Sequence, residues 1–241
     1  MQKGVRKIVN VLFFLLLSLT SFAQYKQGEY EIEWGSEAYS IIQSKDDGYV
    51  LAGYNGNGNG DFYIVKLDSN ANLKWTRTIG GATISAANSV IQTNDGGYAA
   101  TGYCTAYGAG GEDVYVVRLD HLGNVVWTKT IGGPDDDWGN SIVQTYDGGF
   151  AITGGTKSFG GGTPGSADVY VIKLDSLGNK KWTKTVEGPW GSNDEGRSII
   201  QTNDSGYAVT GSTFNTIGGD AFFLEYLISY LLANISIFLI L

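Results

Sequence analysis

The sequence predicts an all-β fold in which four similar repeats each form a four-stranded antiparallel sheet. Three observations predict it: the chain repeats itself about every 50 residues, each repeat holds four short strand-like segments, and turn residues separate those segments. Glycine is abundant, with 36 residues, whereas proline occurs only three times. This composition suits many tight turns, and 13% aromatic residues argue against a disordered chain.

The first repeated block is centred on an Asp-Gly turn. Asp95-Gly96-Gly97-Tyr98 returns as Asp147-Gly148-Gly149-Phe150, and more loosely as Asp47-Gly48-Tyr49 and Asp204-Ser205-Gly206-Tyr207. Glycine accepts the positive φ that a tight hairpin turn requires, so the block predicts a hairpin.

The second repeated block is a strand, a turn and a tryptophan strand. It reads Asp113 to Asp120, Gly123-Asn124 and Trp127 to Thr130, and it recurs at 168–185 and more loosely at 61–78. Its tryptophans, Trp75, Trp127 and Trp182, lie 52 and 55 residues apart. This period is typical of propeller blades and too long for the turns of a β-helix.

The third repeat shows how the strands are expected to be arranged. Its four strand signals are residues 141–145, 150–156, 169–174 and 182–186. Short turns join them, so neighbouring strands must pair antiparallel. The third strand is apolar on both faces, which predicts that sheets cover it on both sides. We therefore expect a β-propeller of four four-stranded blades, closed into a small ring or left as an open arc.

The expected domain organisation follows from these repeats. Residues 24–224 form the propeller, with approximate blades at 28–67, 75–119, 127–174 and 182–224, and residues 29–34 are a candidate extra strand. Gly53, Gly102, Gly154 and Gly211 recur late in the second strand and predict close backbone approach where blades converge. The connection between residues 150 and 168 is longer than its counterparts, which indicates a variable loop face on a rigid scaffold.

The repeated Asp and Trp positions have a structural interpretation. Catalytic groups seldom recur once per repeat, whereas packing groups must. We expect Asp68, Asp120 and Asp175 to cap the turn that follows each of them, and the three repeated tryptophans to wedge between blades.

These units resemble the repeats of bacterial and archaeal secreted β-propeller proteins, which carry the same Asp-Gly-Gly-Tyr, Gly-Asn and Trp-Thr-Lys-Thr blocks. The resemblance covers residues 35–224 in four copies. It implies an extracellular or surface-attached protein. Asp120, Gly123 and Trp127 also loosely resemble a corner of quinoprotein-type propellers.

The N-terminus predicts export. Lys3, Arg6 and Lys7 precede an apolar run, and Ser21-Phe22-Ala23 offers the small residues that a signal peptidase reads. Residues 1–23 are therefore expected to be a cleaved signal peptide. Their removal would change the net charge from −8 to −11, because they carry three basic and no acidic side chains. This acidity excludes nucleic acid and anionic membranes as expected partners.

The fourth repeat departs from the pattern within its third strand. Glu225 stands where Lys66, Arg118 and Lys173 stand in the other repeats, and residues 226–241 are uncharged and largely apolar. A shifted reading frame or truncated gene end is the preferred interpretation of residues 225–241. A membrane anchor and a divergent final strand are the alternatives, and only an anchor would make a membrane a partner.

The sequence offers little catalytic or metal-binding chemistry. His121 is the only histidine, which excludes a His-based triad within the chain, and it occupies a turn position. Cys104 stands alone and is expected to be a buried structural thiol. We therefore predict no catalytic residue, no cofactor and no metal ligand.

Three segments carry oxygen-rich loops of the kind that bind calcium. Residues 135–137 and 193–195 lack the ligand spacing of a known calcium loop and are interpreted as solvated acidic loops. Gly108 to Asp113 resembles one turn of a calcium-binding nonapeptide, but this turn is not repeated in tandem, so we treat the likeness as chance.

The leading functional hypothesis is an exported, non-enzymatic propeller that binds a glycan or a surface protein through loops on one face. A propeller enzyme, either a hydrolase or a quinoprotein-like oxidoreductase, is the first alternative. A structural spacer built from repeats is the second.

Overall fold

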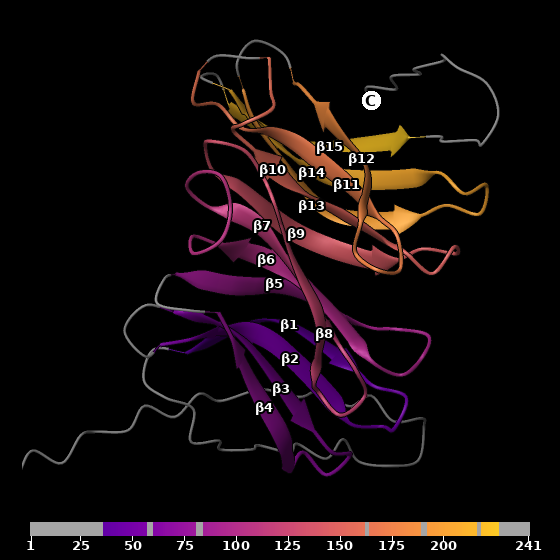
Figure 1. Ribbon diagram of the computed structural model, residues 1–241. Helices are drawn as coiled ribbons and strands as arrows, with labels where there is room; N and C mark the ends of the chain where they lie inside the picture. The colour runs from indigo at the N-terminus through magenta and orange to yellow at the C-terminus, as the bar shows by residue number, and fades with distance from the viewer. Residues whose placement is uncertain are drawn as a thin grey trace, which may run out of the picture.

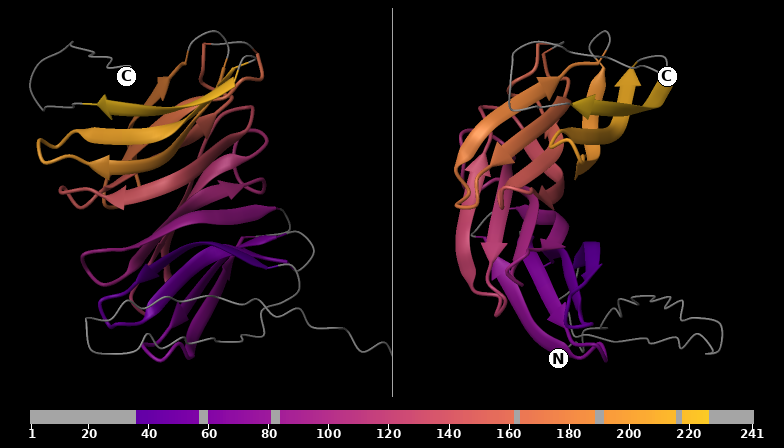
Figure 2. Two further views of the ribbon diagram at one scale, coloured as in Figure 1. Left: turned by 180° about the vertical axis from the view of Figure 1, so that it is seen from behind. Right: turned by 90° about the vertical axis from the view of Figure 1, so that its right-hand side faces the viewer.

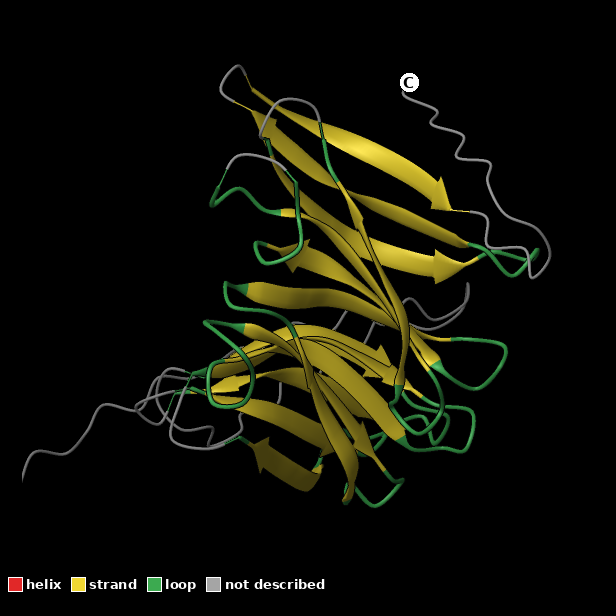
Figure 3. Ribbon diagram, turned by 45° about the horizontal axis from the view of Figure 1, so that its top comes forward, coloured by secondary structure: helices red, strands yellow, loops and turns green. Residues whose placement is uncertain are grey.

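The computed structural model describes residues 36–56, 60–80, 84–161, 164–188, 192–215 and 218–226. The expected signal peptide, the candidate strand at 29–34 and the tail after residue 226 lie outside the described residues. The described chain contains fifteen β-strands in four separate antiparallel sheets (Figures 1 and 3). In the residues that the structure describes, no helix is long and apolar enough to cross a membrane.

Each sheet follows the order of the sequence. The first sheet contains β1 (Glu37–Gln43), β2 (Tyr49–Asn55), β3 (Asp61–Leu67) and β4 (Leu73–Ile79). The second contains β5 (Ser85–Gln92), β6 (Tyr98–Cys104), β7 (Asp113–Leu119) and β8 (Val125–Ile131). The third contains β9 (Asp137–Gln144), β10 (Phe150–Thr156), β11 (Asp168–Leu174) and β12 (Lys180–Val186). The fourth contains β13 (Asn193–Gln201), β14 (Tyr207–Asn215) and β15 (Gly218–Tyr226).

The all-β architecture and the four-stranded blade are thus confirmed for three repeats, whereas the fourth sheet has three strands in the described chain. The expected blade bounds need a correction, because they start the later blades at the Trp strands. β4 pairs with β3, β8 with β7 and β12 with β11, so each Trp strand completes its own sheet. The physical reason is the five-residue Asp-to-Asn turn, which is too short to send the strand elsewhere.

The sheets stack face to face along a curve, like propeller blades. The first strands β1, β5, β9 and β13 contact one another in succession and form the inner wall of the curve. Figure 2 shows the first and last sheets at opposite ends of an open arc, so the described residues do not close a ring. One apolar cluster fills each of the three junctions between neighbouring sheets. Burial of both faces of β7 and β11 confirms the expected stacking.

The repeated tryptophans lie between blades, as expected. Trp75 packs edge-on against Tyr98 of the next sheet with ring centroids 5.8 Å apart. Trp127 meets Phe150 at 5.7 Å and Trp182 meets Tyr207 at 5.8 Å in the same manner. Each blade therefore presents one ring to the blade that follows it.

The turn before each tryptophan is capped by its aspartate, which confirms that expectation. Asp120 Oδ1 accepts the backbone N–H groups of Leu122 and Asn124 at 2.9 and 2.8 Å, and Asp68 and Asp175 make the equivalent bonds. Gly123 adopts a positive φ of 80° and Gly178 one of 78°, whereas Ala71 holds the same place in the first sheet at 63°.

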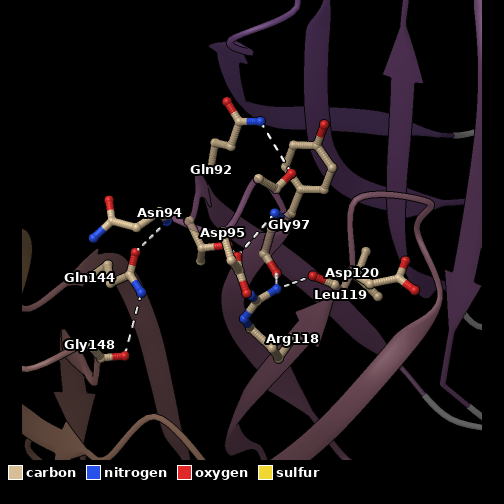
Figure 4. Close-up of polar contacts among 12 residues, drawn as sticks. Gln92, Asn94, Asp95, Gly97, Arg118, Leu119, Asp120, Gln144 and Gly148 are labelled. Atoms are coloured by element: carbon tan, nitrogen blue, oxygen red, sulfur yellow. Dashed lines mark hydrogen bonds and ion pairs between the residues drawn. The ribbon is translucent and has the colours of Figure 1, made fainter.

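A buried cation fixes the Asp-Gly hairpin turn in each of the first three blades, and Figure 4 shows it in the second. The Arg118 guanidinium donates two hydrogen bonds to Asp95, at 2.6 and 2.5 Å, and others to the carbonyls of Tyr98 and Leu119. Lys66 and Lys173 bind Asp46 and Asp147 at 2.8 and 3.0 Å in the same way.

Neighbouring blades are also joined through these turns. Gln144 of the third sheet accepts the backbone N–H of Asn94 in the second sheet at 2.8 Å. Gln92 and Gln201 make the equivalent bonds to Lys45 and Tyr146. The end of each blade that carries the Asp-Gly turns is therefore built from short turns, and these turns make similar contacts from blade to blade.

Candidate functional site

The other end of the blades, opposite the Asp-Gly turns, differs from blade to blade. It holds the connections between second and third strands and those between sheets, and these are longer and unequal. Thr105 to Glu112 joins β6 to β7, whereas residues 157–167 join β10 to β11. We name it the loop end; it is the variable face that the long connection after residue 150 indicates.

A β-bulge occurs in the inner strand of every blade near the loop end. The pairing register shifts at one residue in each first strand, and the residues at these shifts are Tyr39, Asn88, Asn140 and Arg197. A bulge turns a side chain out of the regular alternation. These positions hold a tyrosine, two asparagines and an arginine, whereas the serine and glutamine that follow them recur in all four blades.

The recurring glycines of the second strand lie opposite these bulges. A Cβ on Gly53, Gly102 or Gly154 would lie 1.8 Å from the carbonyl oxygen of the first-strand residue that precedes its pairing partner. Close backbone approach is thus confirmed, but it occurs within each sheet. The second strands also contact the first strand of the next blade, so convergence of the blades at the glycines themselves stays a prediction.

An aromatic side chain stands beside the bulge in each of the first three blades. Tyr54 faces Glu37 across the strands, Tyr103 faces Ala86, and Trp138 faces Gly155. The last two pairs are complementary in size; a Cβ on Gly155 would lie 2.4 Å from the Trp138 ring.

We name Tyr39, Tyr54, Tyr103 and Trp138 the aromatic rim. All four side chains are partly exposed. Tyr39 lies against Tyr54 with ring centroids 5.8 Å apart.

Polar groups of the third and fourth blades surround Trp138. Its indole Nε1 donates to Glu195 Oε1 at 2.7 Å, and Asn140 donates to the same oxygen. Arg197 pairs with the other oxygen of Glu195 at 2.7 Å and remains largely exposed. Lys157 lies 6.0 Å from the Trp138 ring centroid. The rim thus combines aromatic surface with amide, carboxylate and guanidinium groups.

Carboxylates near the rim affect the pKa values of its tyrosines. Burial, then the Glu37 carboxylate, raises the pKa of Tyr39. Burial and then the Glu112 carboxylate raise the pKa of Tyr103. Burial and Asp136 raise the pKa of Glu112, and Lys157 opposes them. Neighbouring carboxylates therefore act on the tyrosines of the rim and on one another.

Two aspartates that the sequence places in solvated loops are buried instead. Asp137 is 0% exposed and Asp194 is 2% exposed, and each begins or nearly begins the first strand of its blade. The interpretation of residues 135–137 and 193–195 as solvated loops is thus wrong for these two residues, although Asp135 and Asn193 are exposed. Topology decides this burial, because the preceding blade's third strand covers the position.

Each buried aspartate faces another from the preceding blade. Asp113, the first residue of β7, lies beside Asp137, and Asp168, the first residue of β11, lies beside Asp194. Burial and Asp137 raise the pKa of Asp113. Burial, Glu187 and Asp194 raise the pKa of Asp168 to about 6.

The remaining sequence candidates lie outside this region. His121 is exposed in the Asp120–Asn124 turn. Cys104 is buried at 1% exposure, as expected, and burial raises the pKa of its thiol. Among the described residues, no three His, Cys, Asp or Glu side chains come together closely enough to hold a metal.

The rim was not identified from the sequence. A signal for part of it exists: when the four repeats are aligned on the recurring serine of the first strand, the residue before the serine and the residue three before it vary widely in size, while the residue between these two is always alanine or glycine. Register shifts are invisible without strand pairing, so the meaning of that variation emerges only from the sheet.

Comparison with known proteins supports the fold and no particular function. No protein-family model matches the chain, and no curated protein matches it. A protein of unknown function from Dyadobacter fermentans is structurally similar, with a TM-score of 0.55, 14% identity and coverage of 77% of this chain. Sqt1 from Chaetomium thermophilum aligns with a TM-score of 0.42 and 15% identity over 73% of this chain. The chain spans 64% and 41% of the lengths of these two proteins.

Proposed function

We propose that this protein is an exported, non-enzymatic binding scaffold, and that its aromatic rim binds a carbohydrate chain. One observation carries the proposal: the rim supplies a partly exposed aromatic ring from each of three successive blades, from Tyr54 through Tyr103 to Trp138. A ligand with repeated units suits a surface with repeated contacts.

The chemistry of the rim favours a glycan over other ligands. Aromatic faces bury the apolar face of a sugar ring, while amide and carboxylate groups bind its hydroxyl groups. Asn140, Glu195 and Arg197 supply such groups within reach of the Trp138 ring. The net charge of −8 disfavours polyanions, so we expect a neutral or cationic polysaccharide.

The non-enzymatic part of the proposal rests on the placement of the titratable groups. The sole histidine, His121, occupies an exposed turn at the far end of the blade from the rim. Glu195 is engaged by Trp138 and Arg197 at 2.7 Å each. These contacts orient a binding surface and leave this carboxylate poorly placed for proton transfer.

The test is retention on immobilised polysaccharides and cell-wall extracts. Trp138→Ala is expected to weaken retention about 10-fold or more, because loss of a buried aromatic anchor costs about 2 kcal/mol. Tyr146→Ala is the matched control: Tyr146 is 68% exposed but lies in the Asp-Gly turn at the opposite end. Trp138→Phe keeps a ring and loses the bond to Glu195, which separates stacking from hydrogen bonding.

Equal weakening by Trp138→Ala and Tyr146→Ala would contradict the rim as the binding surface. Absence of wild-type retention over a broad panel would favour the structural spacer. Turnover of a chromogenic glycoside, or quinone absorbance after reconstitution, would favour an enzyme.

A further inference from the structure

The second blade junction contains two facing buried carboxylates, and one oxygen of Asp113 has no partner among the described residues. Asp113 is 1% exposed and Asp137 is 0% exposed. Asp137 accepts hydrogen bonds from Gly133 N at 2.7 Å, from Ser158 Oγ at 2.8 Å and from Thr156 Oγ1. Asp113 Oδ2 accepts Ala109 N at 3.1 Å, whereas the buried Oδ1 has no partner among the described residues.

The unpartnered oxygen of Asp113 and Oδ2 of Asp137 both lie against Gly132. A Cβ on Gly132 would lie 1.8 Å from Asp113 Oδ1 and 2.7 Å from Asp137 Oδ2. The two oxygens come from adjacent sheets and converge where this glycine has no side chain. An unpaired buried carboxylate is costly, and two that face each other are stabilised by a cation between them or by a shared proton.

The third junction repeats the arrangement. Asp194 Oδ2 accepts Gly188 N at 2.6 Å and Ser192 Oγ at 2.8 Å, while its buried Oδ1 has no partner in the described chain. Asp168 is 3% exposed and follows Ala167, whose carbonyl accepts the backbone N–H of Asp194 at 2.7 Å. Burial, then the exposed Glu187 and the buried Asp194, raise the pKa of Asp168. The first junction differs, because Ser85 stands in place of the second aspartate and accepts Phe62 N at 2.9 Å.

The cationic side chains of the loop end are engaged elsewhere. Lys157 pairs with Asp136 at 2.9 Å and Arg197 pairs with Glu195 at 2.7 Å. Among the described residues no cationic side chain is therefore left to neutralise either pair, and a cation from solution would do so. The side-chain atoms that could ligate a cation at these junctions are all oxygens, and hard cations prefer oxygen ligands.

We propose that the second and third blade junctions each bind a Ca²⁺ ion, one between Asp113 and Asp137 and one between Asp168 and Asp194. Two segments that were not accepted as calcium sites from their sequences, 108–113 and 135–137, come together at the first of these sites. Backbone carbonyls of these loops and water supply the remaining ligands, because no third acidic side chain among the described residues reaches the Asp113–Asp137 pair. The ions would cross-link successive blades.

The test is a calcium titration of the whole protein at pH 7.5, read by thermal unfolding. Ca²⁺ at 100 times its dissociation constant is expected to raise Tm by about 5–10 °C per occupied site over protein in EGTA. Isothermal titration should give two sites, and Tb³⁺ should show sensitised emission because Trp138 adjoins Asp137.

Asparagine variants locate the sites. Asp113→Asn and Asp168→Asn should each remove one site from the titration. Asp61→Asn, the control at the first junction, should leave both. The wild-type titration needs no variant, so misfolding of a variant does not remove the test.

A flat Tm from EGTA to millimolar Ca²⁺, with no heat of binding, would overturn the proposal. If Asp113→Asn then raised Tm at pH 7.5 but not at pH 4.5, a proton shared by the two carboxylates would be the correct account. These outcomes are independent of glycan retention, so either proposal can fail alone.

Discussion

Gly123→Ala tests whether the repeated tryptophans are wedged beneath the turns of the next blade. The Cβ of the alanine would lie 2.9 Å from Cε2 and 3.0 Å from Cδ2 of Trp75. Gly123 also has a φ of +80°, so alanine adopts a left-handed conformation there. The conformational part costs about 1–2 kcal/mol. Overpacking against the ring adds about 1–3 kcal/mol, so we expect a total loss of about 2–5 kcal/mol.

Gly96→Ala separates the two contributions. Gly96 has a φ of +86°, nearly the same as Gly123, but no heavy atom lies within 4 Å of the position that an alanine methyl would occupy. Its substitution should cost only the conformational part, about 1–2 kcal/mol. The free energy of unfolding is measured by urea denaturation followed by tryptophan fluorescence.

The comparison can refute the packing argument. If the two substitutions cost the same within about 0.5 kcal/mol, Trp75 does not hold the turn and the wedge is incidental. In a Trp75→Ala background, Gly123→Ala should cost about as much as Gly96→Ala, because the ring that it strikes is gone. A cost that stays high in this background would place the strain in the backbone of the turn.

Four further outcomes follow from the same contacts. Ala71→Gly should stabilise the protein by about 1 kcal/mol in urea denaturation, because Ala71 holds a positive φ of 63°. Lys173→Met should cost about 2 kcal/mol, since it leaves buried acceptors unpaired, whereas Asp147→Asn should cost under about 1 kcal/mol because Asp147 is 65% exposed. Burial raises the pKa of Asp46, but hydrogen bonds, chiefly from Lys66, outweigh it and lower this pKa to about 2. The ionised Asp46 therefore stabilises the fold fully above about pH 4, and this contribution should be lost in acid titrations as the pH falls towards 2. Glu225→Lys should raise Tm, because the register opposite Ala208 places Glu225 where the other blades hold their cation.

Most of the blade could be predicted because its determinants are local. The Asp-to-Asn turn and the Asp-Gly hairpin depend on residues within five positions of one another, and both form as the sequence predicts. The tryptophan packing was predictable because one ring per repeat must find the same place in each blade. The blade bounds were displaced by one strand, since a periodic sequence can be divided at any phase.

The loop end could not be predicted, because its contacts join segments far apart in the sequence. Asp113 and Asp137 are 24 positions apart, and each alone is typical of a solvated loop. Their burial depends on how one sheet stacks on the next. The bulges depend likewise on pairing between strands, and no residue type marks them.

Departures from the repeat separate packing from function in this chain. Ala71 stands where the second and third blades have Gly123 and Gly178, which lie against a tryptophan of the preceding blade. The described chain has no blade before the first one, so no such tryptophan restricts the residue at position 71. The second blade pairs a small first-strand residue, Ala86, with a large second-strand residue, Tyr103, and the third blade reverses this with Trp138 and Gly155. The volume of the pair is similar in both blades, so packing permits the difference. Replacement of Ser85 by Asp137 has no such compensation, because it buries a second carboxylate beside Asp113. A substitution that costs stability in the isolated chain is best explained by a ligand that offsets the cost, and this is why the loop end is the place to look for one.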